Sequence, residues 1–180
     1  MPLNFSAAAR NVLNDRAGFL VQVRSPLLVW ETPPAQAHEL QWVTHSGVCS
    51  QRATSSDPLI FEVRKVEHAR PSGLAFGITL GRAANNDIML DDSTVSRFHA
   101  SFQQEERTGV WYLNDAESQN GTFVEGARVS PRLPAPLSSG MCLGFGEVRV
   151  LFLLPEPFAD WVFTRMVRSR PGGLPGSPGR

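Results

Sequence analysis

The chain has 180 residues, of which 42% are apolar and 19% charged, and its 17 basic and 17 acidic side chains balance to a formal net charge of zero. A chain of this length can bury one good core, so we expect one soluble domain with or without an extension. The balanced charge argues against nucleic-acid binding, because no broad positive field is present to displace counterions. The apolar runs are too short or too interrupted to span a membrane, and the first residues lack the basic start and apolar block of a secretion signal. We therefore expect a cytoplasmic protein with neither a nucleic acid nor a membrane as partner.

Few side chains are candidates for metal or catalytic chemistry. Cys49 and Cys142 lie far apart in the sequence; one disulfide is an alternative, but two buried free thiols are the favoured interpretation. The cysteines and histidines show no metal-ligand spacing, and no nucleophile elbow, phosphate loop or paired carboxylate motif is present. We expect a protein that is not an enzyme and that takes no metal or cofactor.

The first of three zones, residues 1–57, is predicted to be a mixed α/β extension of unknown role. Asn4 or Ser6 can cap a short helix within residues 7–23, and this helix is predicted to pass into an apolar strand. The segment Leu-Leu-Val-Trp-Glu after Pro26 predicts another strand, which Pro33 and Pro34 end. A short strand at 41–43 and a polar linker at 46–57 complete the zone.

The second zone, residues 58–155, has the pattern of an all-β protein. Short apolar runs recur about every ten residues between clusters of Gly, Asn, Asp and Pro, which predicts a β-sandwich. The runs are LIFEVRKV, GITLG, DIML, HASFQQ, VWYLND, TFVEG, ARV and MCLGFGEVRVLFLL. Two dipeptides, Asn120-Gly121 and Glu125-Gly126, allow the positive φ angles of tight turns.

The third zone, residues 156–180, contains a predicted helix and a tail. Phe158, Trp161, Val162 and Met166 have helical spacing, so we expect a short helix that docks on the domain. From Ser169 the chain is rich in Pro and Gly, and this composition predicts a disordered tail.

Three loop motifs in the second zone carry residue types that suit a phosphate group. Arg82 follows Gly81 at the end of a predicted strand, and an arginine presents a planar fork of donors to phosphate oxygens. The hydroxyl of Ser96 can donate to the same group. Asn120 can pair with a peptide backbone through both its amide N–H and its C=O, although an Asn-Gly turn by itself is an alternative interpretation.

Other residues of these loops have two interpretations each. His99 is a structural residue that pins its loop, or a catalytic base; a base would need an orienting acid that the motif does not supply, so the structural role is favoured. Arg97 either is a second arginine that contacts the ligand or the loop, or is a solvated surface charge. Ser118 is either another hydroxyl at the same surface or a simple turn residue.

Together the motifs resemble the forkhead-associated domain family, a β-sandwich that binds phosphothreonine peptides. The resemblance spans about residues 58–155 and rests on Gly81-Arg82, Ser96-Arg97-x-His99 and Ser118-x-Asn120-Gly121-Thr122, in the order and spacing of the family. Asn85-Asn86-Asp87, Asp115 and Phe123-Val124-x-Gly126 also agree with the family pattern, whereas Glu125 stands where members often carry Asn.

This resemblance implies a role for each residue. Arg82 and Ser96 would bind the phosphate, and Asn120 would hold the ligand backbone. Thr94 lies where members can read a residue after the phosphothreonine, and Arg97 is counted with these residues as a contact of the phosphopeptide. Gly81, His99, Gly121 and Thr122 would set the shape of the binding loops.

The implied protein is a bacterial adaptor in Ser/Thr-kinase signalling. Its partner would be a phosphothreonine-containing protein or peptide, either the kinase or its substrate. The alternative is a scaffold or assembly subunit, for example of a secretion apparatus, that uses the sandwich for contacts independent of phosphate. The joint presence of Arg82, Ser96 and Asn120 favours the adaptor.

Overall fold

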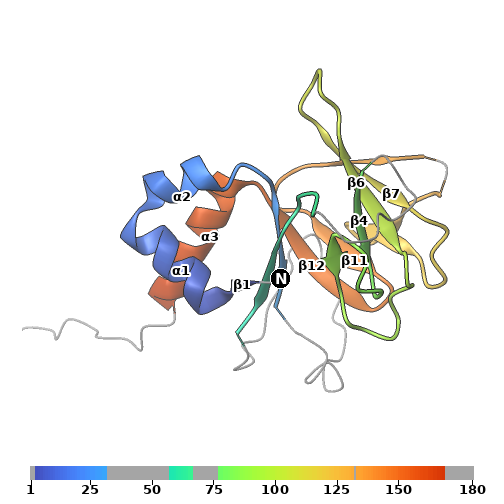
Figure 1. The fold of residues 1–180 in the computed structure, drawn as a ribbon, viewed down its shortest axis with the longest axis horizontal. Helices are drawn as coiled ribbons and strands as arrows, with labels where there is room; N and C mark the ends of the chain where they lie inside the picture. Colours follow the sequence, from blue (N-terminus) through green and yellow to red (C-terminus); the bar gives the residue numbers. More distant parts are fainter. Residues whose placement is uncertain (1–2, 32–56, 67–76, 132, 169–180) are drawn as a thin grey trace, which may run out of the picture.

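The computed structural model describes residues 3–31, 57–66, 77–131 and 133–168. It contains two β-sheets and three helices (Figure 1). The strands are β1 (Leu3–Asn4), β2 (Leu27–Trp30), β3 (Leu59–Glu62), β4 (Ile78–Gly81), β5 (Ile88–Met89), β6 (Ala100–Gln104), β7 (Trp111–Asp115), β8 (Thr122–Val124), β9 (Ala127–Arg128), β10 (Ala135–Leu137), β11 (Cys142–Phe145) and β12 (Val148–Leu153), and the helices are α1 (Phe5–Asn14), α2 (Arg16–Gln22) and α3 (Pro155–Arg168).

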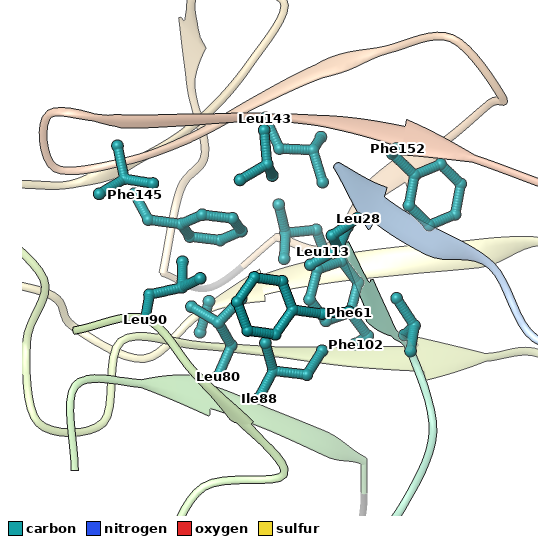
Figure 2. Close-up of a cluster of buried hydrophobic side chains, with 14 of the residues drawn as sticks. Leu28, Phe61, Leu80, Ile88, Leu90, Phe102, Leu113, Leu143, Phe145 and Phe152 are labelled. Carbon is teal, nitrogen blue, oxygen red and sulfur yellow. The ribbon is translucent and has the colours of Figure 1, made fainter. Parts of the chain in front are cut away.

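The two sheets pack face to face, which confirms the predicted all-β sandwich. One sheet has seven strands in the order β1-β3-β2-β12-β11-β8-β9, and the other has five in the order β10-β7-β6-β4-β5. All neighbouring strands are antiparallel except β4 and β5. Large apolar side chains from both sheets fill the space between them (Figure 2), and Leu80, Phe102, Leu113 and Phe145 are completely buried there. This core holds the ends of the strands, and thus the loops between them, in fixed positions.

The first zone supplies two strands, β1 and β2, to the sandwich. Strand β2 lies between β3 and β12 in the seven-stranded sheet, and all four of its residues are buried. Its register pairs Leu28 with Phe61 on one side and with Phe152 on the other. The strand predicted after Pro26 is thus confirmed, and the sandwich extends beyond the range 58–155.

The three helices gather on one side of the molecule (Figure 1). They form a second buried cluster with the outward-facing residues of β2, β3 and β12, among them Val29, Ile60 and Leu153. In α1 the side chain of Asn4 accepts a hydrogen bond from Ala7 N–H, so one of the two predicted caps is used. The helical layer covers one part of the outer face of the seven-stranded sheet.

Residues 16–22 correct one prediction. The apolar segment there is helix α2 and not a strand. Asp15 caps the helix by accepting a hydrogen bond from Gly18 N–H, and Phe19 is buried against Phe158 of α3, with ring centroids 5.8 Å apart. The cap and the tertiary contact outweigh the strand propensity of a short apolar run.

The C-terminal helix is confirmed and is longer than predicted. Phe158 and Val162 are completely buried and Trp161 is half-buried, as the helical spacing indicates. Met166 departs from the prediction, because it is 37% exposed. Among the described residues, no helix has both the length and the apolar character needed to cross a bilayer.

Several smaller predictions have mixed outcomes. The edge strand β10 was not predicted, because Pro136 interrupts its pattern; proline is tolerated there because an edge strand has one unpaired side. Cys142 was expected to be buried but is half-buried, since it lies on the outer face of β11. Cys49, the short strand at 41–43, the linker before Asp57 and the tail from Ser169 fall outside the described residues.

Candidate functional site

The loop that follows β4 lies directly against the loop that precedes β6. Two backbone hydrogen bonds join them, from Arg82 N–H to Ser96 O at 2.9 Å and from Ala83 N–H to Arg97 O at 3.1 Å. Gly81 makes this approach possible, since a Cβ atom at this position would lie 2.4 Å from Arg97 O. The glycine before Arg82 is therefore required by the packing of the two loops.

An open cavity of about 730 Å³ lies over these loops. Four of the residues predicted to contact ligand line it, and the full lining is Arg82, Ala83, Asn85, Ser93, Thr94, Val95, Ser96, Arg97, Phe98, Ala116 and Gln119. The structure thus brings the first two motifs together around one hollow. Asn120 is not part of the lining, but it is next to Gln119 in the chain.

The charge of this cavity is positive and uncompensated by the described residues. Arg82 and Arg97 are both exposed, and neither forms an ion pair within the described part of the chain. Arg82 Nε donates a hydrogen bond to Val95 O at 3.2 Å, which fixes the direction of its side chain. The lining contains no acidic residue. Such a hollow suits a small anionic group.

Ser96 and His99 connect the lining to the third motif. Ser96 Oγ accepts a hydrogen bond from Gln119 N–H at 3.0 Å. Ser96 N–H donates to Nδ1 of His99 at 2.9 Å, so Nδ1 must carry no proton and the ring is protonated at Nε2. Nε2 lies 3.2 Å from Gly121 O and donates to it. Both nitrogens of the buried ring thus hold backbone groups, one in each loop.

Burial lowers the pKa of His99 below its usual value, and the hydrogen bond to Gly121 O and the charge of Asp115 oppose this only in part. Since the folded-state pKa is the lower one, the unfolded chain binds more protons as the pH falls below about 6.5. We therefore expect the free energy of unfolding to be highest above this pH and to decrease as the solution is acidified. Urea unfolding at about pH 7.5 and about pH 5.5 measures the decrease. It should be smaller in His99→Gln, which cannot gain the proton, and an equal decrease in both proteins would contradict the assigned role.

Asn120 is held by the loop before β6. Its Nδ2 donates to Thr94 O at 2.7 Å, and the side chain is exposed, with its carbonyl oxygen available to a ligand N–H. The Thr94 hydroxyl donates to Asp92 at 2.6 Å and accepts from Glu147 N–H at 3.0 Å. These bonds hold the Thr94 hydroxyl within its own loop. A ligand residue after the phosphothreonine would therefore be contacted by neighbours of Thr94 and not by its hydroxyl.

Comparison with known proteins gives the family. Residues 78–146 match the family model of the FHA domain. These residues form a forkhead-associated domain. The expected membership is thus confirmed, and the match begins at β4 and ends just before β12.

Relatives of this FHA domain occur in bacteria and in animals. The oxoglutarate dehydrogenase inhibitor of Corynebacterium diphtheriae is 41% identical over 75 residues, which cover 42% of this chain and 49% of that protein. The glycogen accumulation regulator GarA of Mycolicibacterium smegmatis is 41% identical over 73 residues, 41% of this chain and 43% of that protein. The human sarcolemmal membrane-associated protein is 32% identical over 90 residues, 48% of this chain and 11% of that protein. The chain thus spans half or less of the length of these relatives.

A buried carboxylate organises the third loop of the FHA domain. Asp115, at the end of β7, accepts hydrogen bonds from Ser118 N–H and Oγ and from Thr122 Oγ1. Ser118 is therefore a buried turn residue and not a surface hydroxyl. A side-chain oxygen that accepts from the backbone N–H three residues on is the bond pattern of a helix N-cap, and Asp and Ser at this spacing are a signal from which the turn could have been predicted.

Asn86 and Asp87 perform a similar task beside Gly81. Asn86 Nδ2 donates to Ala83 O at 2.8 Å and to Arg97 O at 2.7 Å, which joins the two loops a second time. The buried carboxylate of Asp87 accepts from the N–H and the hydroxyl of Thr79 on β4. Burial alone would raise the pKa of Asp87, but the hydrogen bonds from Thr79, Val66 N–H and Lys65 outweigh it, so the pKa lies below its usual value. From the sequence alone, Asn86 and Asp87 are recognised only as residues that match the family pattern, and their roles in joining the loops are not apparent.

The turn between β8 and β9 accommodates the departure at position 125. Glu125 and Gly126 have φ angles of 50° and 80°, so the predicted tight turn with positive φ is present. Positive φ disfavours Glu relative to Asn, but the Glu125 side chain accepts a hydrogen bond from Cys142 N–H. The turn keeps its shape and lies outside the cavity.

Proposed function

We propose that this FHA domain binds phosphothreonine peptides and acts as a non-catalytic adaptor in Ser/Thr-kinase signalling. The observation that carries the proposal is the convergence of Arg82, Ser96 and Arg97 on one open cavity that has no acidic lining. Phosphothreonine carries close to two negative charges near neutral pH and has three strong acceptor oxygens. Two arginine forks and a hydroxyl supply matching donors.

The ligand backbone would be held next to the phosphate. Asn120 is fixed by Thr94 O, and Thr94 lines the cavity, so the amide lies at its border. Each charge-assisted hydrogen bond contributes about 1.5–3 kcal/mol. Two or three of these with backbone pairing imply an affinity on the order of −8 kcal/mol, which corresponds to a micromolar dissociation constant.

The names of two relatives support a regulatory role exerted through binding. One is an inhibitor of oxoglutarate dehydrogenase and the other a regulator of glycogen accumulation. For this chain we propose a cytoplasmic regulator whose partner is a phosphorylated protein, either the kinase or its substrate. The alternative, a scaffold that binds partners without phosphate, predicts that the cavity is dispensable.

A pull-down separates these two functions. The immobilised full chain is incubated with lysate from cells that express it, with and without phosphatase treatment, and Arg82→Ala serves as the matched negative control. Proteins that are retained only from the untreated lysate, and not by Arg82→Ala, support the adaptor. Retention of the same proteins in all three arms would support the scaffold and contradict the proposal.

A further inference from the structure

A row of four residues crosses the outer face of the seven-stranded sheet beside the binding loops. The strand register places Arg128 of β9 opposite Phe123 of β8, Phe123 opposite Gly144 of β11, and Gly144 opposite Arg149 of β12. The two arginines thus stand on either side of Phe123 and Gly144. The buried cluster under the helices includes none of these four residues.

The two arginines differ in what they contact. Arg149 donates hydrogen bonds to Gly146 O and Val148 O, and its guanidinium lies 5.5 Å from the centre of the Phe123 ring. Arg128 is exposed and forms no ion pair or side-chain hydrogen bond with the described residues. Arg149 is therefore part of the sheet surface, whereas the charge of Arg128 is available to a partner.

Arg128 extends toward the end of the sandwich that carries the candidate site. A Cβ atom on Gly121 would lie 2.9 Å from Arg128 Nε and 3.3 Å from its Cζ, so the guanidinium lies against the Asn120-Gly121 turn. Gly121 has a φ of 87° and thus needs to be glycine for its backbone as well. Its lack of a side chain leaves the space that Arg128 occupies.

The position of Arg128 relative to the cavity follows from the contacts between the loops. Asn120 bonds to Thr94, which lines the cavity, and Arg128 lies against the residue that follows Asn120. A peptide held by Asn120 in an extended conformation advances about 3.3 Å per residue. A ligand residue near the phosphothreonine would therefore pass within reach of the long Arg128 side chain.

We propose that Arg128 is a specificity-determining residue that pairs with an acidic side chain of the ligand close to the phosphothreonine. This inference rests on the proposed function. The pairing adds a third positive contact outside the phosphate cavity. The acidic residue would increase affinity without contacting Arg82 or Ser96.

The test is a set of phosphothreonine peptides with alanine at the flanking positions and a single Glu, or a single Lys, placed at each position in turn. Affinities are measured by fluorescence polarisation for the wild type, Arg128→Ala and Arg128→Glu. In the wild type we expect one position, or two neighbouring ones, at which Glu tightens binding about three- to fivefold, the range of an exposed ion pair. Arg128→Ala should lose this preference but bind the all-alanine phosphopeptide as the wild type does. Arg128→Glu should prefer Lys at the same position.

Arg107→Ala is the matched control, because Arg107 is an exposed arginine in the turn after β6, at the end of that strand away from His99. It should keep the wild-type preference. A Glu preference that survives in Arg128→Ala, or no Glu preference in a wild type that binds phosphopeptides, would overturn the inference and leave the proposed function standing. A wild type that binds none of the phosphopeptides would overturn both.

Discussion

Arg82→Ala is expected to weaken phosphothreonine-peptide binding at least tenfold, about 1.4 kcal/mol or more. The substitution removes a guanidinium that lines the cavity and that no described acidic residue neutralises. It leaves the backbone bond from residue 82 to Ser96 O in place, because that bond does not involve the side chain. The loss should therefore appear in the affinity far more than in the stability. Isothermal titration calorimetry measures the first and thermal unfolding the second.

Two variants show whether the guanidinium itself is responsible. Arg82→Lys keeps the positive charge but loses the planar fork and the Nε bond to Val95 O, so its affinity should fall between those of the wild type and Arg82→Ala. Arg107→Ala removes an exposed arginine far from the cavity and should bind as the wild type does. An affinity of Arg82→Ala within about twofold of the wild type would exclude Arg82 from phosphate binding.

Phe102→Ala is expected to lower the free energy of unfolding by about 3–5 kcal/mol, the usual cost of removing a buried phenylalanine ring. Phe102 of β6 is completely buried between the sheets, and its ring centroid lies 6.3 Å from that of Phe145 and 6.4 Å from that of Phe152. Its loss would leave a cavity at the centre of the core shown in Figure 2. Urea unfolding followed by tryptophan fluorescence gives the change.

The matched control is Phe163→Ala on α3. This ring is 58% exposed, so the same substitution should change the free energy of unfolding by less than about 1 kcal/mol. A similar decrease in the free energy of unfolding of the two variants would contradict a core that lies between the two sheets.

Local sequence patterns could predict the parts of the site that depend on neighbouring residues. Gly81-Arg82, Ser96 and Asn120 each belong to a short motif at the end of a strand, and the strands themselves follow from alternating apolar residues. The structure brings Arg82, Ser96 and Arg97 into one lining and places Asn120 beside it.

Features that depend on distant parts of the chain could not be predicted in this way. Strand β2 pairs with β3 and β12, both of which lie more than 25 residues away along the chain. A local sequence pattern can predict a strand, but it does not show which other strands pair with it. Helix α2 depends on the contact between Phe19 and Phe158. Tertiary packing decides both.

The most direct measurement of the central claim is a calorimetric titration of the wild type with two peptides of identical sequence, one with phosphothreonine and one with threonine. The best peptide of the Glu scan is the one to use. Arg82, Ser96 and Arg97 line a cavity with no acidic residue, so we predict micromolar binding of the phosphorylated peptide and affinity lower by a factor of at least about one hundred for the other, since the charge-assisted bonds are lost. Equal affinities for the two peptides would contradict the claim that this domain recognises phosphothreonine.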